Sequence, residues 1–80
     1  CSVSPNPTSG MFYVNIHLPL AREATFHLYD INGKLVGMQH LQLSTGDNQL
    51  RWNITSLANG IYFLRSGDPD IPVIRIVKGW

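Results

Sequence analysis

Three histidines are the side chains of this sequence best suited to holding a metal ion. His17, His27 and His40 fall on three different predicted strands. None of them has a second imidazole two or four residues away, the spacing that places two ligands on one face. We therefore expect solvated histidines on the outer faces of strands and no metal site.

The other reactive groups have no better arrangement. Asp68 and Asp70 flank Pro69 in a predicted loop, where they would hold a cation only weakly, so a solvated turn is the preferred interpretation. Cys1 is the single cysteine, which excludes a disulfide within the chain and a thiolate metal cluster. A first-position cysteine is either the lipid-bearing residue of a mature lipoprotein or, more simply, the point where a longer protein was cut.

Motifs of catalysis are absent from the sequence. No serine sits in a nucleophile elbow, and no glycine-rich phosphate loop follows a predicted strand. No pair of carboxylates is clearly brought together for acid–base work. Asn53-Ile54-Thr55 matches the N-glycosylation sequon, a motif that is common by chance. We predict that the chain is not an enzyme and uses no cofactor.

Composition narrows the class of protein further. Charged residues make up 14% of the 80 residues, below the typical value of about 25%, and the net charge is +1. The six basic residues are spread along the chain, which excludes the clustered basic face of a nucleic-acid-binding protein: Arg22, Lys34, Arg51, Arg65, Arg75 and Lys78. No apolar run of about 18 residues is present, so no transmembrane segment is predicted.

Alternation of apolar and polar residues predicts β-strands throughout the chain. The apolar members expected to face the core are Phe12, Val14, Ile16 and Leu18 in 11–18, Ala24, Phe26 and Leu28 in 24–30, Leu50, Trp52 and Ile54 in 48–54, and Tyr62 and Leu64 in 61–65. A short strand over 2–4 and a last strand over 71–78, with Ile74 and Ile76 inward, complete the set. The turn residues between these strands recur at a spacing of roughly 8–12 residues, which is typical of a sandwich.

Three local features refine the strand assignment. Asn32-Gly33 is the dipeptide that a type I′ hairpin turn favours, so a tight hairpin is predicted there. The apolar positions of the strand over 35–43 change parity, which a bulge near Gly37–His40 would reconcile. Leu57–Tyr62 has the form of a tyrosine corner, in which the Tyr62 hydroxyl returns to the upstream backbone.

The prediction is a single domain over 1–80, an all-β, immunoglobulin-like antiparallel sandwich of about seven strands.

Four segments, in order and over nearly the whole chain, carry a resemblance to a known family. They are Pro5–Gly10 (PNPTSG), Leu28–Val36 (LYDINGKLV), Leu57–Arg65 (LANGIYFLR) and Arg75–Lys78 (RIVK). Together they resemble the type A C-terminal sorting domain of the type IX (Por) secretion system. Gly79 and Trp80 extend beyond the usual close of that family.

The resemblance implies a function in export. Such domains end secreted enzymes and adhesins of Bacteroidetes, and they direct the upstream cargo through the type IX translocon across the outer membrane. A sortase-like peptidase at the surface then removes many of them. The expected fold is an immunoglobulin-like sandwich, and the expected location is the cell surface or the medium, reached through the periplasm.

Strand parity suggests which surface a partner would recognise. If Tyr62, Leu64, Ile74 and Ile76 face the core, an apolar stripe with basic flanks faces outward. The predicted docking residues are Ile61, Phe63, Val73, Arg75, Val77 and Lys78, with Arg65 beside them. The last strand is also expected to offer free backbone groups to a partner strand. The alternative is that both faces of these strands are covered within the parent protein.

Two other functions remain open from the sequence. A carbohydrate-binding or adhesive module would need exposed aromatic residues, for which Trp52, Trp80 and a platform of Tyr13 and Tyr29 are the candidates. Trp52 shares parity with core residues, so packing is the favoured role for it. A plain structural spacer beside a catalytic domain is the third interpretation.

Overall fold

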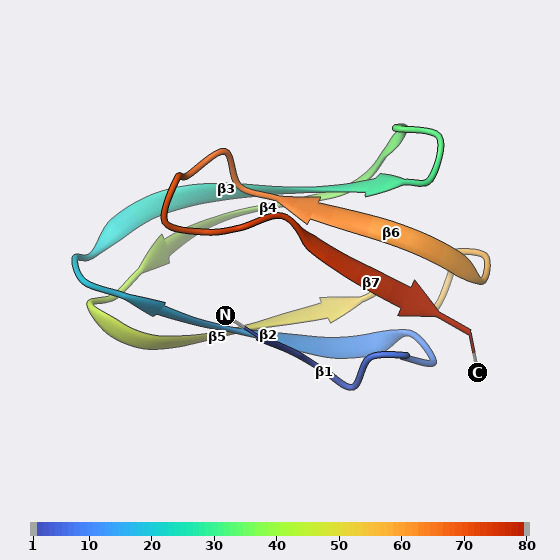
Figure 1. Cartoon of the computed structure of the whole chain (residues 1–80), viewed down its shortest axis with the longest axis horizontal. Helices are drawn as coiled ribbons and strands as arrows, with labels where there is room; N and C mark the ends of the chain where they lie inside the picture. Colours follow the sequence, from blue (N-terminus) through green and yellow to red (C-terminus); the bar gives the residue numbers. More distant parts are fainter. Residues whose placement is uncertain (1, 80) are drawn as a thin grey trace.

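The computed structural model describes residues 2–79 as two antiparallel β-sheets packed face to face (Figure 1). The strands are β1 Ser2–Ser4, β2 Met11–Leu18, β3 Arg22–Asp30, β4 Leu35–Leu43, β5 Gly46–Asn53, β6 Gly60–Arg65 and β7 Ile74–Lys78. One sheet has the order β1-β2-β5 and the other β4-β3-β6-β7. The predicted immunoglobulin-like sandwich of seven strands is confirmed. Within these residues there is no helix able to span a membrane.

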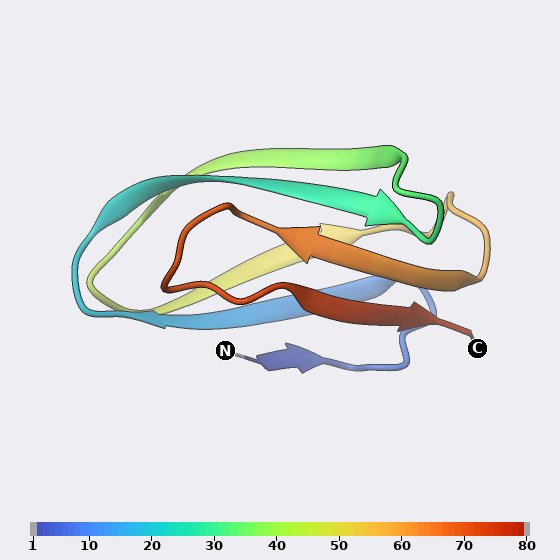
Figure 2. The same ribbon diagram turned by 45° about the horizontal axis from the view of Figure 1, so that its top comes forward.

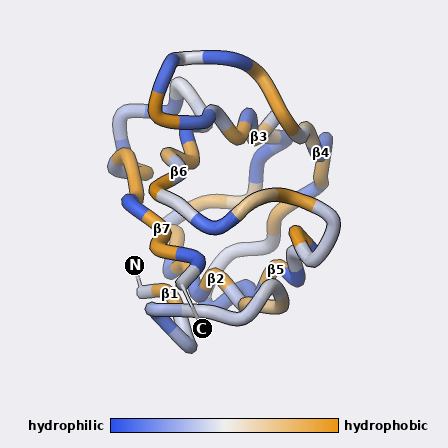
Figure 3. Tube along the Cα trace, turned by 90° about the vertical axis from the view of Figure 1, so that its right-hand side faces the viewer, coloured by the Kyte–Doolittle hydropathy of each residue, from blue (hydrophilic) through white to orange (hydrophobic). Residues whose placement is uncertain are grey.

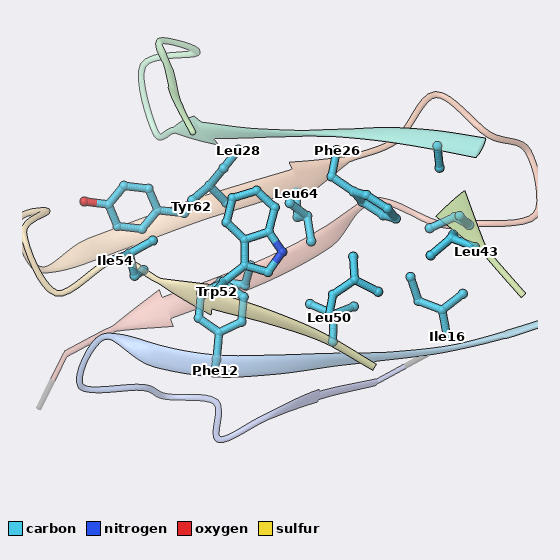
Figure 4. Packing of buried hydrophobic residues seen from close by; sticks show 14 of the residues in the cluster. Phe12, Ile16, Phe26, Leu28, Leu43, Leu50, Trp52, Ile54, Tyr62 and Leu64 are labelled. Atoms are coloured by element: carbon cyan, nitrogen blue, oxygen red, sulfur yellow. The ribbon is translucent and has the colours of Figure 1, made fainter. Parts of the chain in front are cut away.

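The core lies between the two sheets and follows the predicted alternation. Seen end-on, apolar and polar residues alternate along the strands (Figure 3). Every residue predicted to face inward from β2, β3, β5 and β6 is buried, and Phe12, Phe26 and Leu28 are fully so. Each such large apolar side chain stabilises the fold by roughly 1.5–3 kcal/mol. Figure 4 shows them converging from both sheets.

Trp52 belongs to this core, as its parity predicted. Its indole is 4% exposed and stacks on Phe12, with ring centroids 6.4 Å apart and an interplanar angle of 5°. The platform of Tyr13 and Tyr29 is wrong, because β2 and β3 belong to different sheets. The connection between these strands crosses from one layer to the other, so the two tyrosines lie on opposite outer faces. Trp80 and Cys1 lie outside the described residues.

The β3–β4 hairpin forms as predicted, but the type I′ turn is wrong. Among residues 2–79 no residue other than glycine has a positive φ, so Asn32 does not take the conformation that this turn requires. Gly33, with φ 83°, closes the loop instead, and its N–H donates to the Asp30 carbonyl at 3.0 Å. The Asp30 carboxylate also accepts from the N–H groups of Asn32 and Lys34, both at 2.9 Å. These hydrogen bonds stabilise a loop that is longer than the two-residue turn predicted from Asn32-Gly33.

The bulge in β4 lies slightly earlier than predicted. Leu28 pairs with Gly37 while Tyr29 pairs with Leu35, so Val36 is the extra residue. Gly37 consequently faces inward, where a Cβ would lie 3.2 Å from the Trp52 ring. The Trp52 indole therefore needs a residue without a side chain at position 37, and this requirement fixes where β4 changes parity.

The last strand is shorter than predicted, because it begins at Ile74 rather than Ile71. Ile71 is buried, but its N–H donates to the Asp68 carbonyl within the loop, and Pro72 has no N–H to offer a ladder. Asp70 is exposed, as a solvated turn predicts, but Asp68 is largely shielded, and both carboxylates bond Arg22. The Arg22 guanidinium Nη1 donates to both Asp68 oxygens at 3.1 Å and to Asp70 Oδ2 at 2.7 Å.

This cluster makes the stability of the domain sensitive to acid. The Asp70 backbone N–H, followed by the Arg22 guanidinium, lowers the pKa of Asp68 below its ordinary value of 3.8. A depressed carboxyl pKa stabilises the fold above the ordinary value, and that contribution is lost as the pH falls through the lowered pKa. We expect the melting temperature to fall below about pH 4, and to fall less steeply in Asp68→Asn. Identical acid profiles for the two proteins would contradict this assignment.

Candidate functional site

All four motif segments meet at one end of the sandwich, on the right in Figures 1 and 2. Strand pairing brings them together: Asp30 lies opposite Tyr62, and Gly60 lies opposite Lys78. Lys78 in turn forms a parallel bridge with Thr8. The motifs are therefore one structural unit, although they are spread over the sequence.

The first motif, Pro5–Gly10, lies along β7, and we call it the strap. The Asn6 side chain donates to the Arg75 carbonyl at 3.1 Å and accepts from the Val77 N–H at 2.9 Å. The backbone of Thr8 continues the contact, because its N–H donates to Val77 O at 2.8 Å and its carbonyl accepts from Gly79 N at 3.2 Å. The first and last motifs thus hold each other.

The end of the strap is anchored in the interior. Thr8 is fully buried, and its hydroxyl donates to the Met11 carbonyl at 2.7 Å and accepts from the Gly10 N–H at 3.0 Å. The Gly10 carbonyl accepts from Ile54 N at 2.6 Å. Gly10 has φ 141°, and a Cβ there would lie 2.9 Å from the Thr55 Cα. Only glycine fits this crossing.

The tyrosine corner predicted in the third motif is confirmed. Tyr62 is buried, and its hydroxyl donates to the Ala58 carbonyl at 2.5 Å, four residues upstream. This bond ties the β5–β6 connection to the start of β6, which is the role of such corners in immunoglobulin-like sandwiches.

Tyr62→Phe removes only the hydroxyl of this corner. We expect the free energy of unfolding to fall by about 1–2 kcal/mol, because the Ala58 carbonyl loses a partly buried partner. Denaturant unfolding measures the change. Tyr13→Phe, on the exposed face of β2, is the matched control and should cost far less. Equal losses of stability in the two variants would show that the tyrosine corner does not contribute to the stability of the fold.

Lys78 does not face outward, which corrects its place among the docking residues. It shares the parity of Ile74 and Ile76, and only 7% of it is exposed. Its ammonium donates to the carbonyls of Thr55, at 3.3 Å, and Leu57. The sequence pattern grouped Lys78 with the basic flanks by its charge, whereas its position in the strand directs it inward.

The other predicted docking residues come together on the outer face of the β4-β3-β6-β7 sheet. Ile61 pairs with Val77 and Phe63 with Arg75, so these four form a compact outer stripe of half-buried apolar side chains beside an exposed guanidinium. Val73, which is 56% exposed, precedes β7 in the loop.

The outer face extends further than sequence parity indicated. Tyr29 lies opposite Phe63 and next to Leu35 in the register, so the apolar surface continues onto β3 and β4. A hollow of about 490 Å³ lies there, lined by Tyr29, Asp30, Ile31, Gly33, Phe63, Arg65 and Val73. Tyr29 and Leu35 were not predicted as docking residues. The order of the strands in the sheet decides which residues lie side by side, and the alternation of apolar and polar residues does not reveal that order.

The edge of β7 is not free, contrary to the expectation from the sequence. From the Arg75 carbonyl to the Gly79 N–H, the strap already bonds four backbone groups of this strand and its end. A short segment that covers an edge is a common protection against unwanted strand pairing.

Two of the three histidines bond neighbouring side chains, on different sheets. His17 bonds Asp47 at 2.8 Å on one sheet, and His40 bonds Thr25 at 2.6 Å on the other. Among residues 2–79 no three His, Cys, Asp or Glu side chains gather as a metal site would require.

Comparison with known proteins covers the first three motif segments and the first residue of the fourth. The model of the secretion system C-terminal sorting domain family matches residues 2–75, which is nearly the whole chain, and ends within β7. No curated protein and no solved structure matches the chain. The family is one of sorting signals rather than of catalysts. The chain belongs to this family, the type IX secretion sorting domains.

Proposed function

We propose that this domain carries an upstream cargo protein through the type IX translocon and across the outer membrane, and that a sortase-like peptidase then removes it. Membership of the sorting-domain family is the observation that carries this proposal. The cargo is then delivered to the cell surface or the medium. In this arrangement the 80 residues are the sorting domain of a larger secreted protein.

The outer stripe is the surface that we propose the translocon recognises. Ile61, Phe63 and Val77 are only half-buried by neighbours in the sheet, and Arg75 and Val73 stand exposed beside them. Apolar surface rimmed by charge is typical of a docking site. Tyr13 and Tyr29 lie on different sheets and Trp52 is buried, so these three residues form no aromatic platform for sugar, which withdraws their support from the carbohydrate-binding alternative.

An export assay tests the sorting role. The chain is fused to the C-terminus of a periplasmic reporter fluorescent protein in a Bacteroidetes host with a working type IX system. We expect the reporter at the surface or in the medium, and expect it to be lost when the translocon is disabled. The released reporter should lack the mass of the domain if the peptidase acts on it. An intact, folded fusion that stays in the periplasm would contradict the proposal.

A further inference from the structure

The strap covers the edge of β7, but it bonds this edge only partly as a β-strand would. Two of its four bonds come from the Asn6 carboxamide, an exposed side chain that donates and accepts as a peptide group would. The other two come from the backbone of Thr8. Pro5 and Pro7 have no N–H, so the strap cannot extend this pairing into a continuous ladder. A true strand would bond the same edge more fully.

The two halves of the strap differ in how firmly they are held. The half that follows Pro7 is anchored by the buried Thr8 and by Gly10. The preceding half, from Pro5 to Pro7, is exposed and follows β1, which has three residues at the edge of its sheet. Local opening starts in segments with few buried contacts, so the half with Asn6 can lift while the Thr8 anchor stays.

The surface beneath this half adjoins the outer stripe. Val77 and Arg75, whose backbone groups Asn6 covers, also present their side chains on that outer face. A strand added to β7 would therefore extend the stripe. Its side chains on that face would lie beside Val77, which favours an apolar residue, and beside the Arg75 guanidinium, which favours a carboxylate.

We propose that the β7 edge is a strand-addition site, which the Asn6 half of the strap occupies until an extended, acidic and apolar segment of the secretion machinery replaces it. This inference rests on the proposed sorting function. Strand addition supplies main-chain hydrogen bonds, and the neighbouring side chains supply selectivity. The strap then both protects the edge and sets how readily it opens.

Asn6→Ala tests the inference by two measurements on one variant. Hydrogen exchange of the free chain should show the Val77 amide exchanging roughly tenfold faster, because its bond to Asn6 is gone. The Ile76 amide, in the residue paired with Tyr62, should not change. The initial export rate of the reporter fusion should rise with the open fraction of the edge, by up to roughly tenfold. Ser9→Ala, exposed on the same strap, is the control for both.

Asn6→Asp is a milder variant, which keeps the inference testable if the alanine variant does not fold. It keeps the acceptor for the Val77 N–H and loses the donor to the Arg75 carbonyl, so both effects should be smaller. Faster Val77 exchange with unchanged or slower export would overturn the strand-addition site. Association of Asn6→Ala into dimers would also overturn it, because the occupant would be a second copy. Loss of export in the unaltered fusion would instead refute the sorting function.

Discussion

Gly10→Ala is expected to lower the free energy of unfolding by about 2–4 kcal/mol, which is a large part of the stability of so small a domain. The added methyl would lie 2.5 Å from the Thr55 Cγ2 and 2.9 Å from the Thr55 Cα, and the residue would also hold φ at 141°. Backbone cannot move aside as a flexible side chain can. We expect the melting temperature to fall by about 10–25 °C.

Two further variants separate the collision from the backbone strain. Gly67→Ala places a methyl at φ 77° with nothing within 4 Å, so it should show strain alone, about 1 kcal/mol. Thr55→Ser removes the Cγ2 and keeps the hydroxyl that bonds Asn53, so it should partly rescue Gly10→Ala. If Gly10→Ala and Gly67→Ala cost the same, the close crossing of the strap over Thr55 would carry no energetic weight.

Phe63→Asp is expected to reduce export of a fused reporter by roughly thirtyfold, the effect of losing about 2 kcal/mol at an interface hot spot. Phe63 lies at the centre of the outer stripe, between Tyr29 and Arg75 in the register. A carboxylate there removes apolar contact area and neutralises the neighbouring guanidinium. Pulse-labelled fusion protein in the medium and in the periplasm gives the export rate.

Tyr13→Asp is the matched control for this variant. It introduces the same charge and the same poor strand propensity on the outer face of the other sheet, where Tyr13 is 39% exposed. We expect both variants to stay folded and only Phe63→Asp to lose export. If both lose export equally, the reduction comes from folding or from charge in general, and the outer stripe is not the recognised surface.

The sequence was sufficient for the layers of this fold because alternation along each strand reports burial directly. The alternate apolar residues of two strands face inward as their parity predicts: Phe12, Val14, Ile16 and Leu18, and Ala24, Phe26 and Leu28. The tyrosine corner was also accessible, since its residues lie within a few positions of each other. Local spacing therefore carries both features.

Long-range placement was not accessible in the same way. The bond from Asn6 to Val77 joins residues 71 positions apart, and nothing in either motif indicates which strand the other covers. Lys78 was misplaced because its charge suggested solvent, while two carbonyls from a distant turn satisfy it inside. The turn at Gly33 departed from type I′ because the Asp30 carboxylate stabilises another loop. Each of these depends on tertiary contacts.

Direct contact between the outer stripe and the secretion machinery is the central claim, and photo-cross-linking tests it most directly. A photoreactive phenylalanine analogue is placed at position 63 or at position 13 of the exported fusion, and cross-linked products are identified by mass spectrometry. We predict adducts with outer-membrane components of the translocon from position 63 and none from position 13. Efficient export with no adduct from position 63, or with equal adducts from both positions, would contradict the claim.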